Sequence, residues 1–313
     1  MKKKNKIFLV TGGTGFIGSN ICKMLVREGH KVIVYDNNFR GKLEKISQIK
    51  KKIIFIKGDI RDKKKLLKAI KKVNAVIHLA YINGTKYFYT KPDLILDIAV
   101  KGMTNILDGC KKYNVKELYL ASSSEVYQTP TKVPTDENEM LKIPDIHNPR
   151  YSYGGGKIIS ELMCIHYGKK FFKRLIIFRP HNVYGANMGN EHVIPEFINR
   201  FKSLKGKKFK IQGTGNEIRS FIYIDDFVEA FKILIKKGKH LNIYNIGTSE
   251  KIMIKNLVKL LSKFFNKTIV IKRTSLQRGG TKIRIPEIAK IKKLGFKPKF
   301  NLLKGLHQTI NYK

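Results

Sequence analysis

The chain has 313 residues, 42% of them hydrophobic, enough for one large domain or two modest ones around a hydrophobic core. No run approaches the roughly 18–20 apolar residues of a membrane helix, and the apolar stretch near the N-terminus is too short for an export signal. The formal net charge is +41, but lysines are spread over nearly every expected helix and loop, which indicates solvated faces rather than a nucleic-acid surface. The three cysteines lack metal-binding or redox spacing, which favours a cytoplasmic setting without a bound metal.

The first expected strand, 7–10, runs into a glycine-rich turn that opens a helix. Gly12, Gly15 and Gly18 recur at every third position, a spacing that allows a tight turn and lets the helix amino end receive a pyrophosphate. The turn therefore predicts a dinucleotide site. Its expected contacts are Gly12, Gly15, Phe16, Ile17 and Gly18.

The second expected strand, 31–36, ends in Asp36, at the distance expected of a carboxylate that binds a ribose diol. A carboxylate repels a 2′-phosphate, so we expect NAD rather than NADP, although Arg40 and Lys42 lie nearby. The remaining expected cofactor contacts follow this strand and the next two: Asn37, Asp59, Ile60, Leu79 and Ala80.

Strands continue to alternate with helices through the first half of the chain. Strands are expected at 53–59, 75–80, 117–121 and 174–178, and a long helical pattern covers about 91–113. This order predicts an α/β fold with a doubly wound parallel sheet.

Two stretches carry the residues suited to proton transfer. Ser123, Ser124 and Glu125 follow the strand 117–121, at the sheet edge where such folds bind ligands. Tyr153 and Lys157 stand four residues apart, on one face if this segment is helical, and an ammonium near a phenol favours the phenolate.

Between and after these stretches, two features of the chain stand out. Four prolines in 128–150 exclude continuous helix or strand, so we expect a loop over the site, and the next helix is expected at 157–172. Three consecutive glycines, 154–156, indicate close approach of a ligand or another backbone.

Beyond residue 180 the expected elements become shorter, which indicates a smaller mixed α/β part that binds substrate. We therefore expect a dinucleotide-binding domain at 1–180 and a second domain at 181–313. Residues of roughly 215–245 are expected to return to the first domain.

Taken together, these motifs resemble those of the extended short-chain dehydrogenase/reductases, in the family of NAD-dependent nucleotide-sugar epimerases and dehydratases. The likeness extends over nearly the whole chain and includes Thr11–Gly18, Ser122–Tyr127, Tyr153 with Lys157, and 179–185. The resemblance implies a Rossmann fold and oxidation of the sugar at C4. Tyr153 would take the O4 proton, Ser123 would bind the 4-hydroxyl, and Lys157 would bind the nicotinamide ribose and lower the Tyr153 pKa.

The resemblance also implies contacts to a nucleotide-diphosphate sugar and a homodimer formed through the helices near 91–113 and 151–172. Asn182 would contact the diphosphate, and Arg219 would clamp it together with Arg284 or Arg278. Less specific matches add three residues to the expected substrate contacts: Asn83, Val193 and Phe209.

The reaction after C4 oxidation depends on the two residues that follow Ser123. Ser124 and Glu125 match the pattern of one class of sugar 4,6-dehydratases, in which a carboxylate removes the C5 proton before water is lost. We therefore expect an NAD-dependent nucleotide-sugar dehydratase. The alternatives are a 4-epimerase, which needs no carboxylate there, a UDP-glucuronate decarboxylase, which shares the Ser-Glu pair, and a non-catalytic Rossmann protein that binds dinucleotide or nucleic acid.

Overall fold

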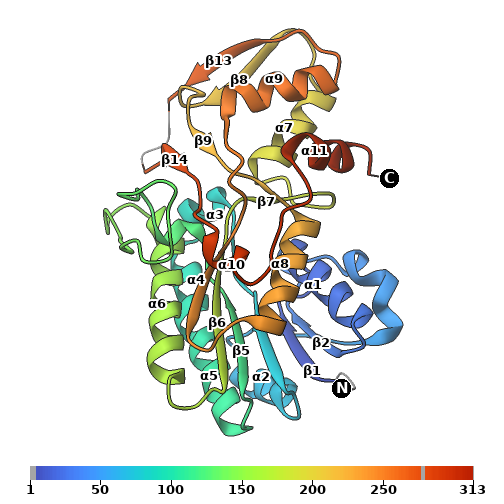
Figure 1. Ribbon diagram of the computed structural model, residues 1–313, viewed down its shortest axis with the longest axis vertical. Coiled ribbons are helices and arrows are strands. Elements are labelled where there is room, and N and C mark those ends of the chain that lie inside the picture. Colours follow the sequence, from blue (N-terminus) through green and yellow to red (C-terminus); the bar gives the residue numbers. More distant parts are fainter. Residues whose placement is uncertain (1–4, 276–278, 313) are drawn as a thin grey trace.

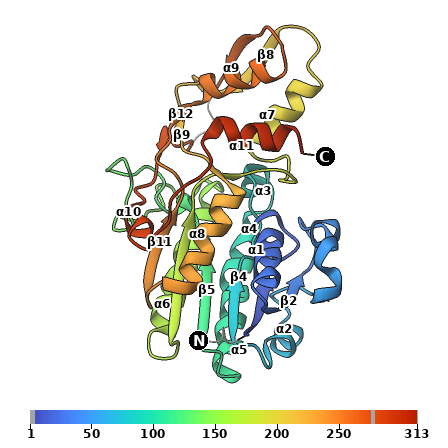
Figure 2. The ribbon, with the colours of Figure 1, turned by 45° about the vertical axis from the view of Figure 1, so that its right-hand side comes forward.

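The computed structural model describes residues 5–275 and 279–312, and its centre is a parallel sheet of seven strands (Figures 1 and 2). Strand order is β11-β6-β5-β4-β1-β2-β3, so the chain winds outward in both directions from the β1–β4 pair, as the alternation of strands and helices predicts. The bounds are β1 Ile7–Thr11, β2 Lys31–Asp36, β3 Ile53–Lys57, β4 Ala75–His78, β5 Glu117–Ala121, β6 Arg174–Pro180 and β11 Asn242–Ile246.

Helices cover both faces of this sheet, because the strands carry buried apolar side chains on both sides. Helices α1 (Phe16–Arg27) and α8 (Ile224–Lys237) pack on one face, in a core that includes Phe178 and Phe231. The other face is covered by helices α2 (Lys63–Ile70), α4 (Pro92–Asp97), α5 (Met103–Lys112) and α6 (Tyr151–Gly168).

The expected long helix of about 91–113 is present as α4 and α5, joined by a π-helical segment, Ile98–Gly102. Three further short segments precede or connect these elements. They are a 3₁₀ segment at Leu43–Lys52, α3 at Thr85–Thr90 and a 3₁₀ turn at Ser124–Val126.

A smaller part of the chain lies beyond the carboxyl ends of the main strands, at the top of Figure 1. It is built from short strands and helices around an aromatic cluster that includes Phe201 and Phe209. Its elements are β7 Val183–Tyr184, α7 Val193–Lys202, β8 Lys208–Gln212, β9 Ile218–Arg219, β10 Ile222–Tyr223, β12 Ile252–Met253, α9 Ile254–Phe264, β13 Val270–Thr274, β14 Ile283–Arg284 and α11 Leu302–Ile310, with α10 (Ala289–Lys292) near β11.

The chain returns from this upper part to the main sheet. Strand β11 pairs in parallel with β6, and α8, which precedes it, packs against α1. Residues 224–246 therefore belong physically to the sheet layer, although they follow several elements of the upper part.

Helix α6 differs from the sequence prediction: it begins at Tyr151, six residues before the expected start. The expected close approach of another backbone is found at Gly154, whereas Gly156 lies against side chains. A Cβ on Gly154 would lie 3.0 Å from the Glu125 carbonyl oxygen, and one on Gly156 would lie 2.1 Å from the Tyr81 hydroxyl. Close packing thus accounts for glycine at both positions, and it places Tyr153 within the helix.

The described part of the chain contains neither a membrane-spanning helix nor a cluster of metal ligands. No helix between residues 5 and 312, with 276–278 left aside, is long and apolar enough to cross a bilayer. Within the same residues, no three His, Cys, Asp or Glu side chains gather as metal ligands would.

Candidate active site

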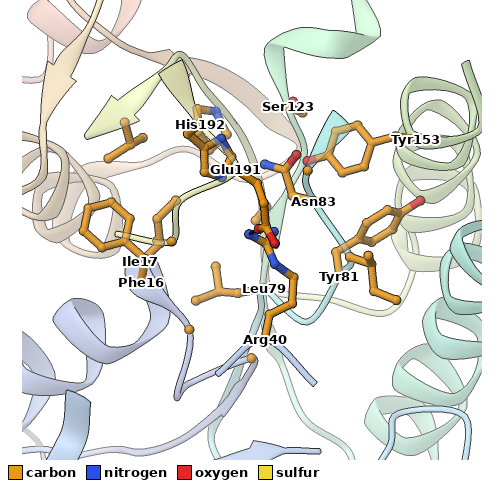
Figure 3. Close-up of a pocket in the computed structure, with 18 of the residues that line it drawn as sticks. Phe16, Ile17, Arg40, Leu79, Tyr81, Asn83, Ser123, Tyr153, Glu191 and His192 are labelled. Carbon is orange, nitrogen blue, oxygen red and sulfur yellow. Dashed lines mark hydrogen bonds and ion pairs between the residues drawn. The ribbon is translucent and has the colours of Figure 1, made fainter. Parts of the chain in front are cut away.

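A cavity of about 930 Å³ lies where the carboxyl ends of the main strands meet the upper part of the molecule (Figure 3). Most of the residues singled out from the sequence line it, although they come from both parts of the chain. They are Gly12, Gly15, Phe16, Ile17, Gly18, Asp36, Asn37, Asp59, Ile60, Leu79, Ala80, Asn83, Ser123, Ser124, Glu125, Tyr153, Lys157, Asn182, Val193, Arg219 and Arg284.

The glycine turn between β1 and α1 has the form that a dinucleotide site requires. Gly12 has a positive φ of 73°, and a Cβ there would lie 2.7 Å from the Ala80 nitrogen. A Cβ on Gly18 would lie 2.1 Å from the Gly12 carbonyl oxygen, so side chains are excluded at both positions. No described side chain caps the amino end of α1, which leaves its backbone N–H groups and positive dipole for a pyrophosphate.

Acidic side chains line the next part of the wall. Asp36 ends β2 and is buried, and its two oxygens accept hydrogen bonds from Thr14 N at 3.0 Å and Asn38 N at 2.8 Å. Hydrogen bonds from Arg61 lower the pKa of Asp59, whose carboxylate also accepts a bond from Asn37 at 3.0 Å. A rigid carboxylate at the end of β2 suits a ribose diol, so the wall fits NAD.

Ser123, Tyr153 and Lys157 come together at the inner end of the cavity. Burial raises the pKa of Tyr153 to about 12, while a side-chain hydrogen bond with Ser123 lowers it. Lys157 Nζ donates to the Ala121 carbonyl oxygen at 2.7 Å and lies 3.8 Å from the centroid of the Tyr81 ring.

The expected effect of Lys157 on the Tyr153 pKa stays a prediction, because burial dominates the pKa of this tyrosine. The ammonium lies over the ring of Tyr81 and is 5.9 Å from the centroid of the Tyr153 ring. Burial also lowers the pKa of Lys157 to about 7, which reduces its positive charge at neutral pH. Desolvation is therefore the largest influence on the pKa of both side chains.

Glu125 lies in a positively charged part of the wall. Its Oε1 accepts a hydrogen bond from Arg284 Nη1 at 2.7 Å and lies 3.9 Å from Arg150 Nη2. Burial raises the pKa of Glu125, but the charges of Arg284 and Arg150 and the bond from Arg284 outweigh it and leave the pKa below its ordinary value. Glu125 is therefore an ionised carboxylate at neutral pH.

The two arginines expected to clamp a diphosphate are both on the wall, and both have partners in the protein. Besides Glu125, Arg284 bonds Thr281 Oγ1 at 3.0 Å, while its buried Nε has no partner among the described residues. Arg219 donates to backbone carbonyls, including that of Thr281 at 2.7 Å. Burial, followed by the charge of Arg284, lowers the pKa of Arg219 to about 10.

Two of the expected substrate contacts, Phe209 and Arg278, are not among the described residues that line the cavity. The side chain of Phe209 is buried in the core of the upper part, where its ring stacks on Phe201 at 4.4 Å, so the structure does not bring it to the cavity. Residues alternate along β8, so Phe209 points inward while Gln212 at the end of the strand reaches the cavity. Arg278 lies outside the described residues.

Several wall residues were missed from the sequence: Tyr81, Arg150, Arg40, Glu191 and His192. Arg150 could have been found, because arginine is scarce beside the many lysines of this chain. Tyr81 directly follows the expected contacts Leu79 and Ala80. Arg40 was noted only as a charge near Asp36, and nothing local in the sequence links it to Glu191.

The names of known relatives describe three related reactions. A dTDP-D-glucose 4,6-dehydratase of Dictyostelium discoideum is 34% identical over 80% of this chain, although the match spans 61% of that protein. A putative UDP-glucose 4-epimerase of Methanocaldococcus jannaschii is 33% identical over 98% of both chains. A UDP-N-acetyl-α-D-glucosaminuronate decarboxylase of Bacillus cytotoxicus is 30% identical over 100% of this chain and 98% of its own.

A solved structure and a family model agree with these relatives. The UDP-glucose 4-epimerase of Thermotoga maritima, solved with UDP-glucose, superposes with a TM-score of 0.89 at 28% identity and covers 98% of each chain. The model of the NAD dependent epimerase/dehydratase family matches residues 8–247. The chain therefore belongs to the NAD-dependent epimerase/dehydratase family, a family of nucleotide-sugar enzymes, and its cofactor is NAD.

Proposed function

We propose that this protein is an NAD-dependent nucleotide-sugar dehydratase that works through a 4-keto-sugar. The observation that carries the proposal is Glu125, an ionised carboxylate on the wall of the cavity, two residues after Ser123. A 4-epimerase has no need of a carboxylate there, whereas loss of water requires a base for the C5 proton. A dehydratase is among the relatives, beside an epimerase and a decarboxylase.

The first stage is oxidation at C4. Ser123 binds the sugar 4-hydroxyl and Tyr153 accepts its proton, in keeping with the influence of Ser123 on the pKa of Tyr153 and with the place of both side chains on the cavity wall. Bound NAD supplies the hydride acceptor for this stage and the hydride donor for the last one. Lys157 binds the nicotinamide ribose, and Asn182, Arg219 and Arg284 hold the diphosphate.

The second stage is loss of water. The 4-keto group acidifies the proton at C5; Glu125 removes that proton and gives it to the 6-hydroxyl, which leaves as water with Ser124 beside it. Return of the hydride to C6 and of a solvent proton to C5 then completes the 4-keto-6-deoxy product. Arg284 keeps Glu125 ionised and fixes its position through the 2.7 Å hydrogen bond. Ser124 is itself buried at the start of the 3₁₀ turn, so both side chains are held by the same local structure.

Replacement of Glu125 by Gln tests the proposal, because the amide has nearly the same shape but cannot take a proton. We expect the wild type to remove one water from at least one of a panel of UDP-, GDP-, dTDP- and CDP-sugars, and Glu125→Gln to lose at least about 100-fold in this rate. Product masses measure the reaction, and NAD content shows that the site is intact. Glu139→Gln, on the loop 128–150 but outside the cavity, is the matched control. Normal water loss by Glu125→Gln contradicts the proposal.

A decarboxylase is the second candidate, and Arg150 favours it. This arginine lies beside Glu125 and adds a third positive charge to this wall, which suits a sugar that carries a carboxylate. The same panel should then include uronic-acid nucleotides, whose products would have lost carbon dioxide. Products of unchanged mass with a new anomeric NMR signal would instead identify a 4-epimerase.

A further inference from the structure

Arg40 and Glu191 form an ion pair across the cavity, and we call these two residues the clasp. Arg40 lies in the segment after β2, in the first part of the chain, and Glu191 lies between β7 and α7 of the upper part. Figure 3 shows their side chains meeting between Phe16 and Ile17 on one side and Tyr81 and Tyr153 on the other. The clasp thus links two segments that are 151 residues apart.

A third segment supports the clasp. The hydroxyl of Tyr87, in α3, donates to Glu191 Oε1 at 3.4 Å. The guanidinium of Arg40 lies 5.6 Å from the centroid of the Tyr87 ring, and the Phe39 ring packs against the same tyrosine at 5.7 Å. Arg40 and Glu191 are therefore oriented by neighbours, unlike a pair of free surface side chains, for which an ion pair contributes little.

The neighbouring His192 carries no charge that would compete with Glu191 for Arg40 or with Arg40 for Glu191. His192 follows Glu191, and burial together with the positive charge of Arg40 lowers its pKa to about 4, so its ring is neutral at neutral pH. Glu191 compensates the charge of Arg40 at the wall where Asp36 and Asn37 also lie. The guanidinium is thus engaged by a carboxylate of the opposite segment.

In a redox-neutral reaction the same dinucleotide must stay bound from the first hydride transfer to the last. A hydride taken from the sugar in the first stage must be returned in the last, so loss of the reduced dinucleotide in between leaves the sugar oxidised and the enzyme empty. We propose that the clasp retains the dinucleotide, and that Arg40 and Glu191 act as one unit that slows its dissociation. This proposal rests on NAD binding and not on which of the candidate reactions follows.

Displacement of NADH measures retention directly. Protein loaded with NADH is mixed with excess ADP-ribose, and the change in NADH fluorescence gives the dissociation rate. The variants are Arg40→Gln, Glu191→Gln and the double variant. Asp108→Asn, which breaks the exposed Lys63–Asp108 pair away from the cavity, is the control for loss of a charge. Thermal unfolding of each variant reports that the fold is intact.

We expect each single variant to release NADH roughly three- to tenfold faster than the wild type, in keeping with a partly exposed ion pair. The double variant should be no faster than either single one, because the second replacement removes nothing more. The control should keep the wild-type rate.

Two results overturn the proposal. One is an unchanged rate in both single variants, which would make the clasp irrelevant to retention. The other is multiplication of the two effects in the double variant, which would mean that Arg40 and Glu191 act separately. Since no sugar nucleotide is present, neither result depends on the outcome of the Glu125 experiment.

Discussion

The side chain of Lys157 is almost completely buried. Burial lowers its pKa from 10.5 to about 7, so between these values the unfolded chain binds a proton that the folded chain lacks. The contribution of Lys157 to the free energy of unfolding therefore rises with pH from about 7 to about 10.5, by up to about 1.4 kcal/mol per pH unit. Below pH 7 both states are protonated and the contribution is constant.

Replacement of Lys157 by Met should remove this dependence. Relative to the variant, the wild type should gain about 2–3 kcal/mol of unfolding free energy between pH 7.5 and 9.5. Urea unfolding at several pH values measures both curves, and Lys63→Met at the surface controls for the loss of one positive charge. If the unfolding free energies of wild type and Lys157→Met change with pH in parallel, the amino group is not desolvated, and the structural interpretation is wrong.

The position of a residue at the cavity could be predicted from the sequence where a short local motif defines it. The glycine turn, Ser123 with Glu125, and Tyr153 with Lys157 are each defined by short spacings, and all reach the cavity. The position of the Lys157 ammonium over Tyr81 could not be predicted, since it depends on how α6 packs against the end of β4. The pairing of Arg40 with Glu191 likewise depends on how distant segments meet.

Helix α6 shows how packing can override local preference. Glycine lowers helix propensity by up to about 1 kcal/mol per residue, and the local pattern places the helix at 157–172, whereas the resemblance implies a helix near 151–172. Contacts with Tyr81 and Glu125 stabilise the segment only in the folded chain. The local pattern therefore places the start of α6 six residues too late, whereas the resemblance places it near residue 151, where the helix begins.

Two glycines of α6 should respond oppositely to alanine. At Gly156 a Cβ would lie 2.1 Å from the Tyr81 hydroxyl and 2.9 Å from Ala99 Cβ, so Gly156→Ala should destabilise the protein by about 1–3 kcal/mol. At Gly155 the nearest atom is Ile143 Cδ1 at 3.1 Å, the flexible end of a partly exposed side chain, so Gly155→Ala should be neutral or stabilising by up to about 1 kcal/mol. Denaturant unfolding of the two variants compares them directly, and equal effects would contradict this packing.

At the scale of the whole molecule, the outer faces of α4, of the π-helical segment that continues it (Ile98–Gly102) and of α6 carry exposed apolar side chains. Leu96 and Val100 lie at 44% and 43% exposure, and Ile159 and Leu162 at 37% and 47%. The two helices pack side by side on one face of the sheet, so these residues lie on adjacent helices (Figure 1). We propose that this surface contacts a second copy of the chain, since exposed apolar residues on adjacent helices suit such a contact.

The net charge of +41 opposes that association, because two copies repel each other. A dimer held by this apolar face should therefore become stronger as salt screens the lysines, while an interface built from ion pairs would weaken. Leu162→Asp should raise the dimer dissociation constant at least about tenfold, since it places a charge within the apolar face. Light scattering after gel filtration at low and moderate salt measures the mass, and Leu303→Asp on α11, exposed to a similar degree, is the control. A mass that is the same for Leu162→Asp and wild type at every concentration would exclude this face as the interface.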